Sequence, residues 1–282
     1  MNGEFLFDNL LVSEGATFSG SGWVLPLENL LDRAMIARPA RCSTPSNAVI
    51  RVDFGRALSL SRWFLAHLTV TLSATYSIRA SSTDAHSGDL LDQPAQRIWN
   101  RVMPSMALPW DDAGWWRGLP RERDMAQYPR HLWVHMDKTR ARYWELTIAD
   151  PTSVTGYVDV GYAMAGQPVT VNYNFDLGRR RLRRSRSVVE VTPGGGVITA
   201  RRRPLRGHAM NFSLLSPSEA ARFYDMGQRA GLTDPIVFVP SPDDHRDILR
   251  DVYPARLITS IEPRRDQQSV WSLAVELQEL IA

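Results

Sequence analysis

Hydrophobic and polar residues alternate along much of the first 170 residues of the chain. In residues 50–54 every second position is apolar, and the same spacing recurs in residues 76–80, 144–148 and 158–162. A period of two is typical of a β-strand with one buried face. Turn-forming residues separate these stretches, at 44–47, Gly55, 150–151 and Gly156. Many short strands without long amphipathic helices between them predict an antiparallel β-sandwich or jelly roll.

The alternation stops between Ser81 and Arg130. This stretch is rich in proline and tryptophan, and it is longer than a plain connection between two strands. We therefore interpret residues 81–130 as a Trp-rich insertion in the first domain.

The second part of the chain opens with an arginine-rich run, residues 179–186, followed by two short apolar stretches, 188–191 and 197–200. Pro193 and three glycines separate the two stretches and predict the turn of a β-hairpin. Ser216 and Glu219 have the spacing of a capping box, which predicts a helix over residues 217–230. Residues 236–239 and 271–278 predict further strands.

These elements predict a mainly β chain of two modules. We expect an N-terminal arm (1–26), a jelly roll (27–170) that contains the insertion, and a second β-rich domain (171–282) with one helix. Tryptophan and charge are divided between the two modules. Eight of the nine tryptophans lie at or before Trp144, while the net charge is −1 for residues 1–170 and +4 for residues 171–282.

Composition excludes several classes of protein. Hydrophobic residues make up 44% and charged residues 22% of the 282 residues, as in globular proteins. No apolar stretch is long enough for a membrane-spanning helix, and the N-terminus lacks the basic start of a signal peptide. Cys42 is the single cysteine, which excludes an intrachain disulfide and a cysteine-based zinc site.

Motifs that carry catalysis or bind cofactors are missing from the sequence. It contains no phosphate-binding glycine loop and no nucleophile elbow. His131 and His135 fall in a predicted strand without a carboxylate cluster, and the Asp pairs at 111–112 and 243–244 lack the spacing of a calcium loop. We expect no enzyme activity, no cofactor and no metal. The one acidic cluster that could test this expectation is Asp111, Asp112, Glu122 and Asp124.

Two sets of residues are candidates for binding. Four tryptophans of the insertion could contact a protein partner or stack on a sugar, or pack the insertion onto its own sheet; they are Trp99, Trp110, Trp115 and Trp116.

The other set is basic. Residues 179–206 hold ten arginines against one acid, Glu190, and three interpretations stay open: a solvated linker, a surface for an acidic partner, or the lining of a channel for DNA. The ten are Arg179, Arg180, Arg181, Arg183, Arg184, Arg186, Arg201, Arg202, Arg203 and Arg206.

Several segments also resemble known families. Residues 29–32, 49–55, 72–80, 142–151 and 156–161 resemble the opening and closing strands of a discoidin, or galactose-binding-like, jelly roll, in the variant found in virion structural proteins of tailed bacteriophages. The second domain resembles the β-rich domains of distal tail and other minor tail proteins of siphophages. The segments that carry this second resemblance are 214–216, 236–239, 253–261 and 275–277.

The resemblance implies a structural component of a phage tail tip or baseplate, made in the host cytoplasm and located in the virion. Such proteins form homo-oligomeric rings, here expected as a trimer or hexamer, and contact tail-tube, tape-measure, hub or fibre proteins without inserting into a membrane. DNA passing through the ring lumen is a further partner to test. The alternative is a carbohydrate-binding adhesin that contacts a host glycan, although the discoidin family's sugar-binding loop residues have no recognisable counterparts here.

Overall fold

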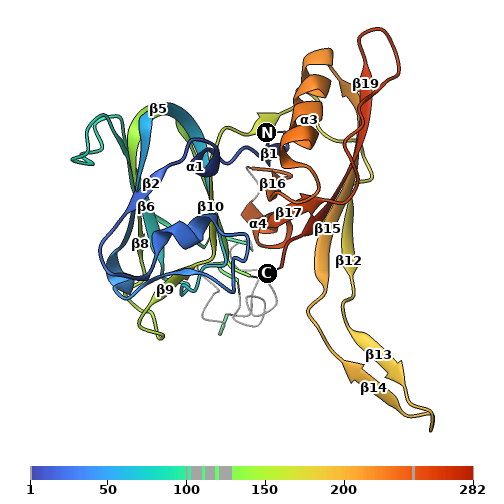
Figure 1. Ribbon diagram of the computed structural model, residues 1–282, viewed down its shortest axis with the longest axis horizontal. Helices are drawn as coiled ribbons and strands as arrows, with labels where there is room; N and C mark the ends of the chain where they lie inside the picture. Colours follow the sequence, from blue (N-terminus) through green and yellow to red (C-terminus); the bar gives the residue numbers. More distant parts are fainter. Residues whose placement is uncertain are drawn as a thin grey trace.

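The computed structural model describes residues 2–99, 101–102, 110–111, 118–120, 129–242 and 245–281. The chain is mainly β and forms two bodies that lie side by side, with a long hairpin that projects from the second (Figure 1).

The first body is a β-sandwich. Its larger sheet has the order β10-β5-β8-β6-β7, with β2 also paired to β5, and the smaller sheet has the order β3-β4-β9. The strands of the larger sheet are β2 (Thr17–Ser19), β5 (Ala48–Ala66), β6 (Thr75–Ser81), β7 (Leu91–Arg97), β8 (His131–Ala149) and β10 (Tyr162–Gly166). Those of the smaller sheet are β3 (Trp23–Leu25), β4 (Ala40–Cys42) and β9 (Val158–Val160).

The alternating residues fill the core between these two sheets. Ile50 and Val52 of β5 and Leu146 of β8 are buried together with Val158 and Val160 of β9, so the mainly β sandwich predicted from the period of two is confirmed. One turn expectation was wrong. Gly55 lies inside the continuous strand β5, where the pairing with β8 shifts register, and its φ of +70° lets the backbone form this bulge without strain.

The second body is an eight-stranded sheet with helices on both sides of it. The sheet order is β11-β1-β16-β17-β19-β15-β12, with β18 paired to β19. Its strands are β1 (Glu4–Leu6), β11 (Val169–Thr170), β12 (Arg180–Arg184), β15 (Leu205–Leu215), β16 (Ile236–Val239), β17 (Pro254–Leu257), β18 (Arg264–Arg265) and β19 (Trp271–Glu279).

Helix α3 (Pro217–Ala230) has the bounds that the sequence predicts. The Ser216 hydroxyl accepts a hydrogen bond from the Glu219 amide, and the Glu219 carboxylate accepts one from the Ser216 amide at 2.8 Å. The sequence predicts one helix in this domain, but the structure has a second, α4 (His245–Asp251). Seven residues make only about two turns, which is too short for a helical period to show in the sequence.

Residues 1–26, expected as an N-terminal arm, take part in both bodies. β1 lies between β11 and β16 in the sheet of the second domain, where Phe5 pairs with Phe238. The chain then crosses to the first body through the short helix α1 (Leu10–Ser13) and enters β2 and β3.

An apolar layer joins the two bodies. Trp63 and Leu65 of β5 point into the sandwich core, whereas Phe64 and Ala66 point the other way and pack with Val237 and Val239 of β16. β8 and β10 likewise contribute Trp133 and Met164 to this layer and their neighbouring residues to the sandwich core. These strands are buried on both faces, which explains why their sequences are continuous apolar runs and not alternating ones.

A buried ion pair crosses this layer. Glu4 of β1 accepts hydrogen bonds from Arg62 of β5 at 2.7 Å and 2.5 Å, and the two side chains are 3% and 8% exposed. The pairing is bidentate, which is the strongest geometry for an arginine and a carboxylate. It fixes the first strand of one body against the long strand of the other.

We expect the Arg62→Met variant to unfold with a free energy about 3–5 kcal/mol lower than the wild type, because the Glu4 carboxylate would stay buried without a partner. The double variant Glu4→Leu/Arg62→Met should recover most of that loss. Urea unfolding followed by circular dichroism measures both. Arg38→Met, at an exposed pair with Asp32, is the matched control and should leave the unfolding free energy unchanged. An equal effect of the Arg62 and Arg38 substitutions would contradict the interpretation.

Candidate functional site

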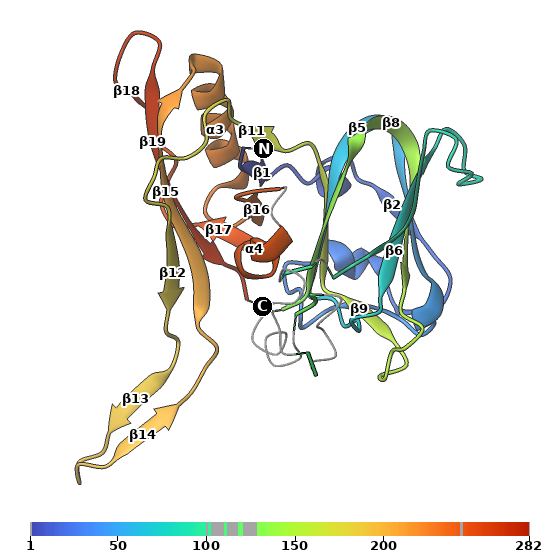
Figure 2. The same ribbon diagram turned by 180° about the vertical axis from the view of Figure 1, so that it is seen from behind.

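The arginine run forms the root of the projecting hairpin. β12 pairs with β15 at the edge of the eight-stranded sheet. Beyond this pair the two strands continue outward as β13 (Val188–Val191) and β14 (Val197–Ala200). Figures 1 and 2 show this arm extending away from both bodies. Residues 180–184 and 188–191 are paired strands, so the run is part of a hairpin. Whether its exposed side faces solvent, an acidic partner or DNA stays a prediction.

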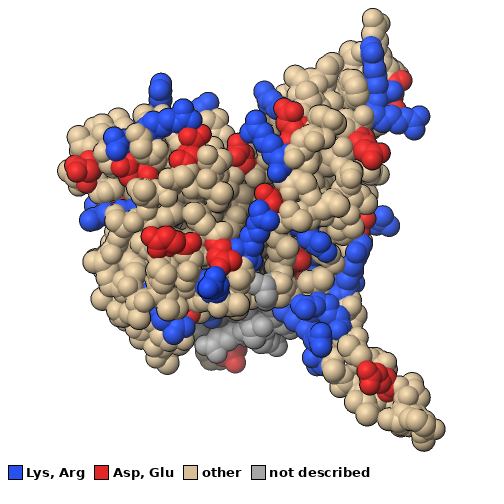
Figure 3. Space-filling view, viewed as in Figure 1, with Lys and Arg blue, Asp and Glu red and all other residues tan. Residues whose placement is uncertain are grey.

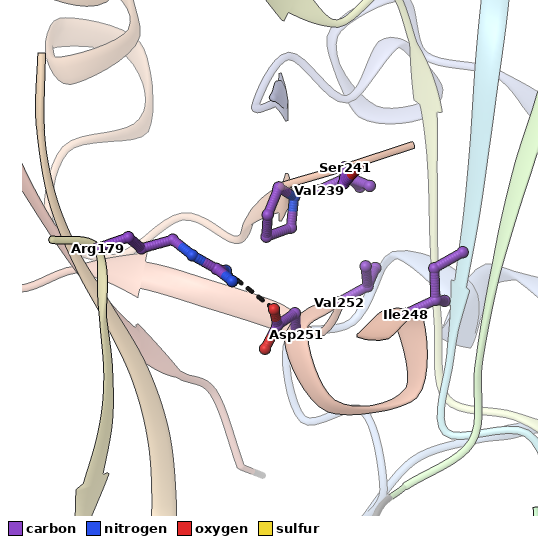
Figure 4. A pocket seen from close by; sticks show the side chains of 7 residues that line it. Arg179, Val239, Ser241, Ile248, Asp251 and Val252 are labelled. Carbon is purple, nitrogen blue, oxygen red and sulfur yellow. Dashed lines mark hydrogen bonds and ion pairs between the residues drawn. The ribbon is translucent and has the colours of Figure 1, made fainter. Parts of the chain in front are cut away.

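Asp251 anchors one side of the root. Its side chain is 2% exposed and accepts hydrogen bonds from Arg179 and Arg181, each at 2.9 Å. Figure 4 shows Arg179 reaching across a small pocket to this carboxylate. The other walls of the pocket come from the layer between the two bodies, including Val239 and Val252. The pair therefore ties the root of the arm to the domain interface.

Glu279 anchors the other side of the root. Its fully buried carboxylate accepts hydrogen bonds from Arg203 at 2.7 Å and Arg206 at 2.6 Å, and the Arg206 guanidinium stacks 4.3 Å above the ring of Tyr253. Burial alone would raise the pKa of Glu279, but the hydrogen bonds and charges of the two arginines hold this pKa below its usual value. A further pair joins Arg184 to Glu276 at 2.6 Å.

Half of the ten arginines are thus neutralised by the chain's own acids. The other five are exposed and form no ion pair within the part of the chain that the structure describes; they are Arg180, Arg183, Arg186, Arg201 and Arg202. Figure 3 shows basic side chains gathered where the arm leaves the body and mostly uncharged atoms beyond them. The arm is therefore cationic near its root and mostly apolar toward its tip, where Glu190 is the one charged residue of 187–200.

The outer part of the arm exposes apolar side chains on both faces. Val189 pairs with Thr199 and Val191 with Val197, so these four β-branched residues share one face. The three valines of this face are 61–70% exposed. Val188 and Ile198 lie on the opposite face and are 41% and 59% exposed. Gly195, with a φ of +79°, forms the turn between the strands, as the sequence predicts.

The structure describes only two of the four candidate tryptophans, and these two differ in exposure. Trp99 is 6% exposed, and its indole donates a hydrogen bond to the carbonyl of Thr71 at 2.8 Å, so it packs against the sandwich. Trp110 is 84% exposed. Trp115 and Trp116 lie outside the described residues, as do Asp112, Glu122 and Asp124 of the acidic cluster.

The described residues contain neither a metal-binding cluster nor a membrane-spanning helix. No group of three or more His, Cys, Asp or Glu side chains there could hold a metal ion. None of the helices among those residues has the length and apolar character to cross a bilayer. His131 and His135 lie in β8, in the strand that the sequence predicts.

A histidine pair lies beside the root of the arm at the domain interface. The rings of His67 and His131 are 5.0 Å apart, and their Nε2 atoms are buried without a hydrogen-bond partner among the described residues. Burial lowers the pKa of His67 to about 4, and the nearby charges of Arg203 and Arg206 act in the same direction while Glu279 opposes them. Burial also holds the pKa of His131 well below its usual value.

Sequence reasoning missed the three acids that hold the root: Asp251, Glu276 and Glu279. Each is distant in sequence from its arginines, and only the pairing of β15 with β19 and the position of α4 bring them together. The one sequence signal for Glu276 and Glu279 was their position in and directly after the final predicted strand, in a domain whose basic run holds few acids. Asp251 had no such signal.

Comparisons with known proteins give matches only among solved structures. No family model and no curated protein matches the sequence. A fucosidase of Ruminococcus gnavus in complex with fucose is 11% identical with a TM-score of 0.38, over 57% of this chain and 27% of that one. The chain thus spans about a quarter of the fucosidase.

Two carbohydrate-binding modules are also similar. CBM32 of AlyQ, in complex with 4,5-unsaturated mannuronic acid, is 15% identical over 53% of this chain and 92% of that one, with a TM-score of 0.33. CpGH89CBM32-6, produced by Clostridium perfringens, is 9% identical over 57% of this chain and 99% of that one, with a TM-score of 0.36.

We expect acid to destabilise the fold through His67. The unfolded chain takes up a proton on this residue below about pH 6.5, whereas the folded protein does so only near pH 4, so stability falls as the pH drops between these values. The loss at about pH 5 should be about 2 kcal/mol for this one group. Asparagine tolerates the φ of +55° at this position, so the His67→Asn variant should keep the fold and lack that part of the pH dependence.

Urea unfolding from neutral pH down to about pH 5 measures the difference between the two proteins. Parallel stability curves for the wild type and His67→Asn would contradict the assignment.

Proposed function

We propose that this chain is a structural component of a phage tail tip or baseplate, which forms an oligomeric ring and joins the tail tube to hub or fibre proteins. The sequence resemblance supplies the setting. The observation that carries an assembly role is the projecting arm, whose tip exposes valine and isoleucine side chains on both faces.

An isolated two-stranded hairpin is only marginally stable in water, and exposed apolar surface of this kind is typical of protein interfaces. The arm fits a protein that is completed by its neighbours. The two bodies behind it are joined by an apolar layer and a buried ion pair, which suits a particle that must hold a fixed shape. On this proposal the unpaired arginines face an acidic neighbour, and DNA in the lumen is the second partner to test.

The purified chain should associate into a ring of three or six copies, alone or together with tail proteins encoded beside it. Sedimentation velocity at micromolar concentration gives the size, and negative-stain electron microscopy gives the shape of the particles. A strictly monomeric chain that binds none of those tail proteins would remove the proposal.

The second candidate function is carbohydrate binding by the sandwich, and the exposed Trp110 favours it. Trp110 is 84% exposed as a residue, and an exposed indole can stack on a sugar ring. If this function holds, a glycan array should show binding that Trp110→Ala abolishes. Tyr173→Ala, at an exposed aromatic residue of the second domain, is the control and should leave that binding intact. An array without bound glycans would remove this candidate.

A further inference from the structure

The loop between β6 and β7 forms an acidic rim on the first body. We use this name for Asp84, Asp89 and Asp92, which are all exposed. Hydrogen bonds from Ser82 and Ser87 hold the pKa of Asp89 near 2, so this carboxylate is charged under all ordinary conditions. Among the described residues the rim makes one ion pair, between Arg79 and Asp92 at 3.1 Å, and its three aspartates and Arg79 together carry a net charge of about −2.

Apolar surface and an open strand edge accompany the rim. Leu90 is 45% exposed, and β7 is the last strand of its sheet in the described structure. Such an edge presents unpaired backbone groups that can accept a further strand. Pro94 interrupts the outer half of β7, so pairing is confined to the part of the strand next to the rim.

The outer arm has the complementary chemistry. Three unpaired arginines, Arg186, Arg201 and Arg202, form a collar below the apolar tip. Hydrogen bonds between Ser187 and Arg202 hold the two strands together at this level. The strands of the tip, β13 and β14, form a sheet of their own with two open edges.

The two surfaces lie at opposite ends of the molecule. Both views show the β6–β7 loop on the outer side of the sandwich and the arm pointing away from it (Figures 1 and 2). The buried acids at the root keep the arm in this direction, so it cannot reach the rim of its own chain. A contact between arm and rim must therefore join two copies head to tail, which closes into a ring when the rotation permits.

We propose that the arm of one copy docks on the acidic rim and the inner half of β7 of a second copy, with the collar arginines against the rim carboxylates and the valine tip against Leu90. This inference rests on the proposed ring. A stable interface buries about 800 Å² on each partner, contributed by about 20 to 30 residues, so nearly the whole outer arm must take part.

Other occupants fit the tip less well. DNA would engage the arginine collar but leave the valines exposed, and the tip has no aromatic residue on which bases could stack. A bilayer would leave the backbone groups at both edges of the hairpin without partners. A protein with a strand edge satisfies the side chains and the backbone together.

A charge swap between two variants tests the contact. Arg201→Glu/Arg202→Glu reverses the collar, and Asp84→Arg/Asp92→Arg reverses the rim. Each variant alone should show a dissociation constant for self-association raised about tenfold or more, since like charges then face each other. An equal mixture should associate more tightly than either variant alone, because every contact between unlike variants joins opposite charges; a six-membered ring can close with alternating variants, whereas a three-membered one leaves one contact of like charges. Sedimentation velocity measures all three samples.

Arg264→Glu/Arg265→Glu on the exposed strand β18 is the control and should associate as the wild type does. Circular dichroism of every variant shows that its fold is intact. The inference is overturned if the rim variant associates normally, or if the mixture stays dissociated while the wild type forms a ring; in both cases the proposed ring itself still stands. A wild type that stays monomeric both alone and with the tail proteins encoded beside it, or that binds a short DNA duplex through the collar without associating in either case, overturns the ring and the docking together.

Discussion

The apolar layer between the two bodies is the constraint on which the rest of the structure depends. Phe64 and Ala66 from the sandwich meet Val237 and Val239 from the second sheet, and the Glu4–Arg62 pair crosses the same layer. Neither partner of a buried ion pair can move into a different environment without losing the other. The layer and the ion pair together fix how the two bodies lie against each other in the structure, and with that the direction of what is attached to them.

The arm inherits its direction from this layer. Its root arginines bind Asp251, at the end of a helix that packs into the layer, and Glu279, at the end of the strand that pairs with β15. The charges that look from the sequence like one continuous basic surface have two separate tasks. Those near the buried acids hold the root in place, and those farther out remain available to a partner.

The sequence predicted the local elements well and the long-range pairings poorly. The period of two located parts of β5, β6, β8 and β9 but not β7, which lies in residues 81–130, where the alternation stops. The glycines located the hairpin turn, and the capping box gave the bounds of α3, because each of these signals lies within a few residues. The domain interface was missed, although the continuous apolar runs around Phe64 and Met164 carried a trace of it. Which arginines are neutralised could not be predicted, because Asp251 and Glu279 reach them only through the fold.

The position of β1 has a consequence for folding during synthesis. β1 is made before β11 and β16, with which it pairs, and Glu4 must meet Arg62 across the finished interface. The sandwich can form as soon as β10 has been made. The second sheet cannot form until the later strands β16 to β19 are available to pair with one another and with β1. The interface is completed only once β16 has been made, which leaves an interval when Phe5 and Leu6 are open to chaperones or to misassembly.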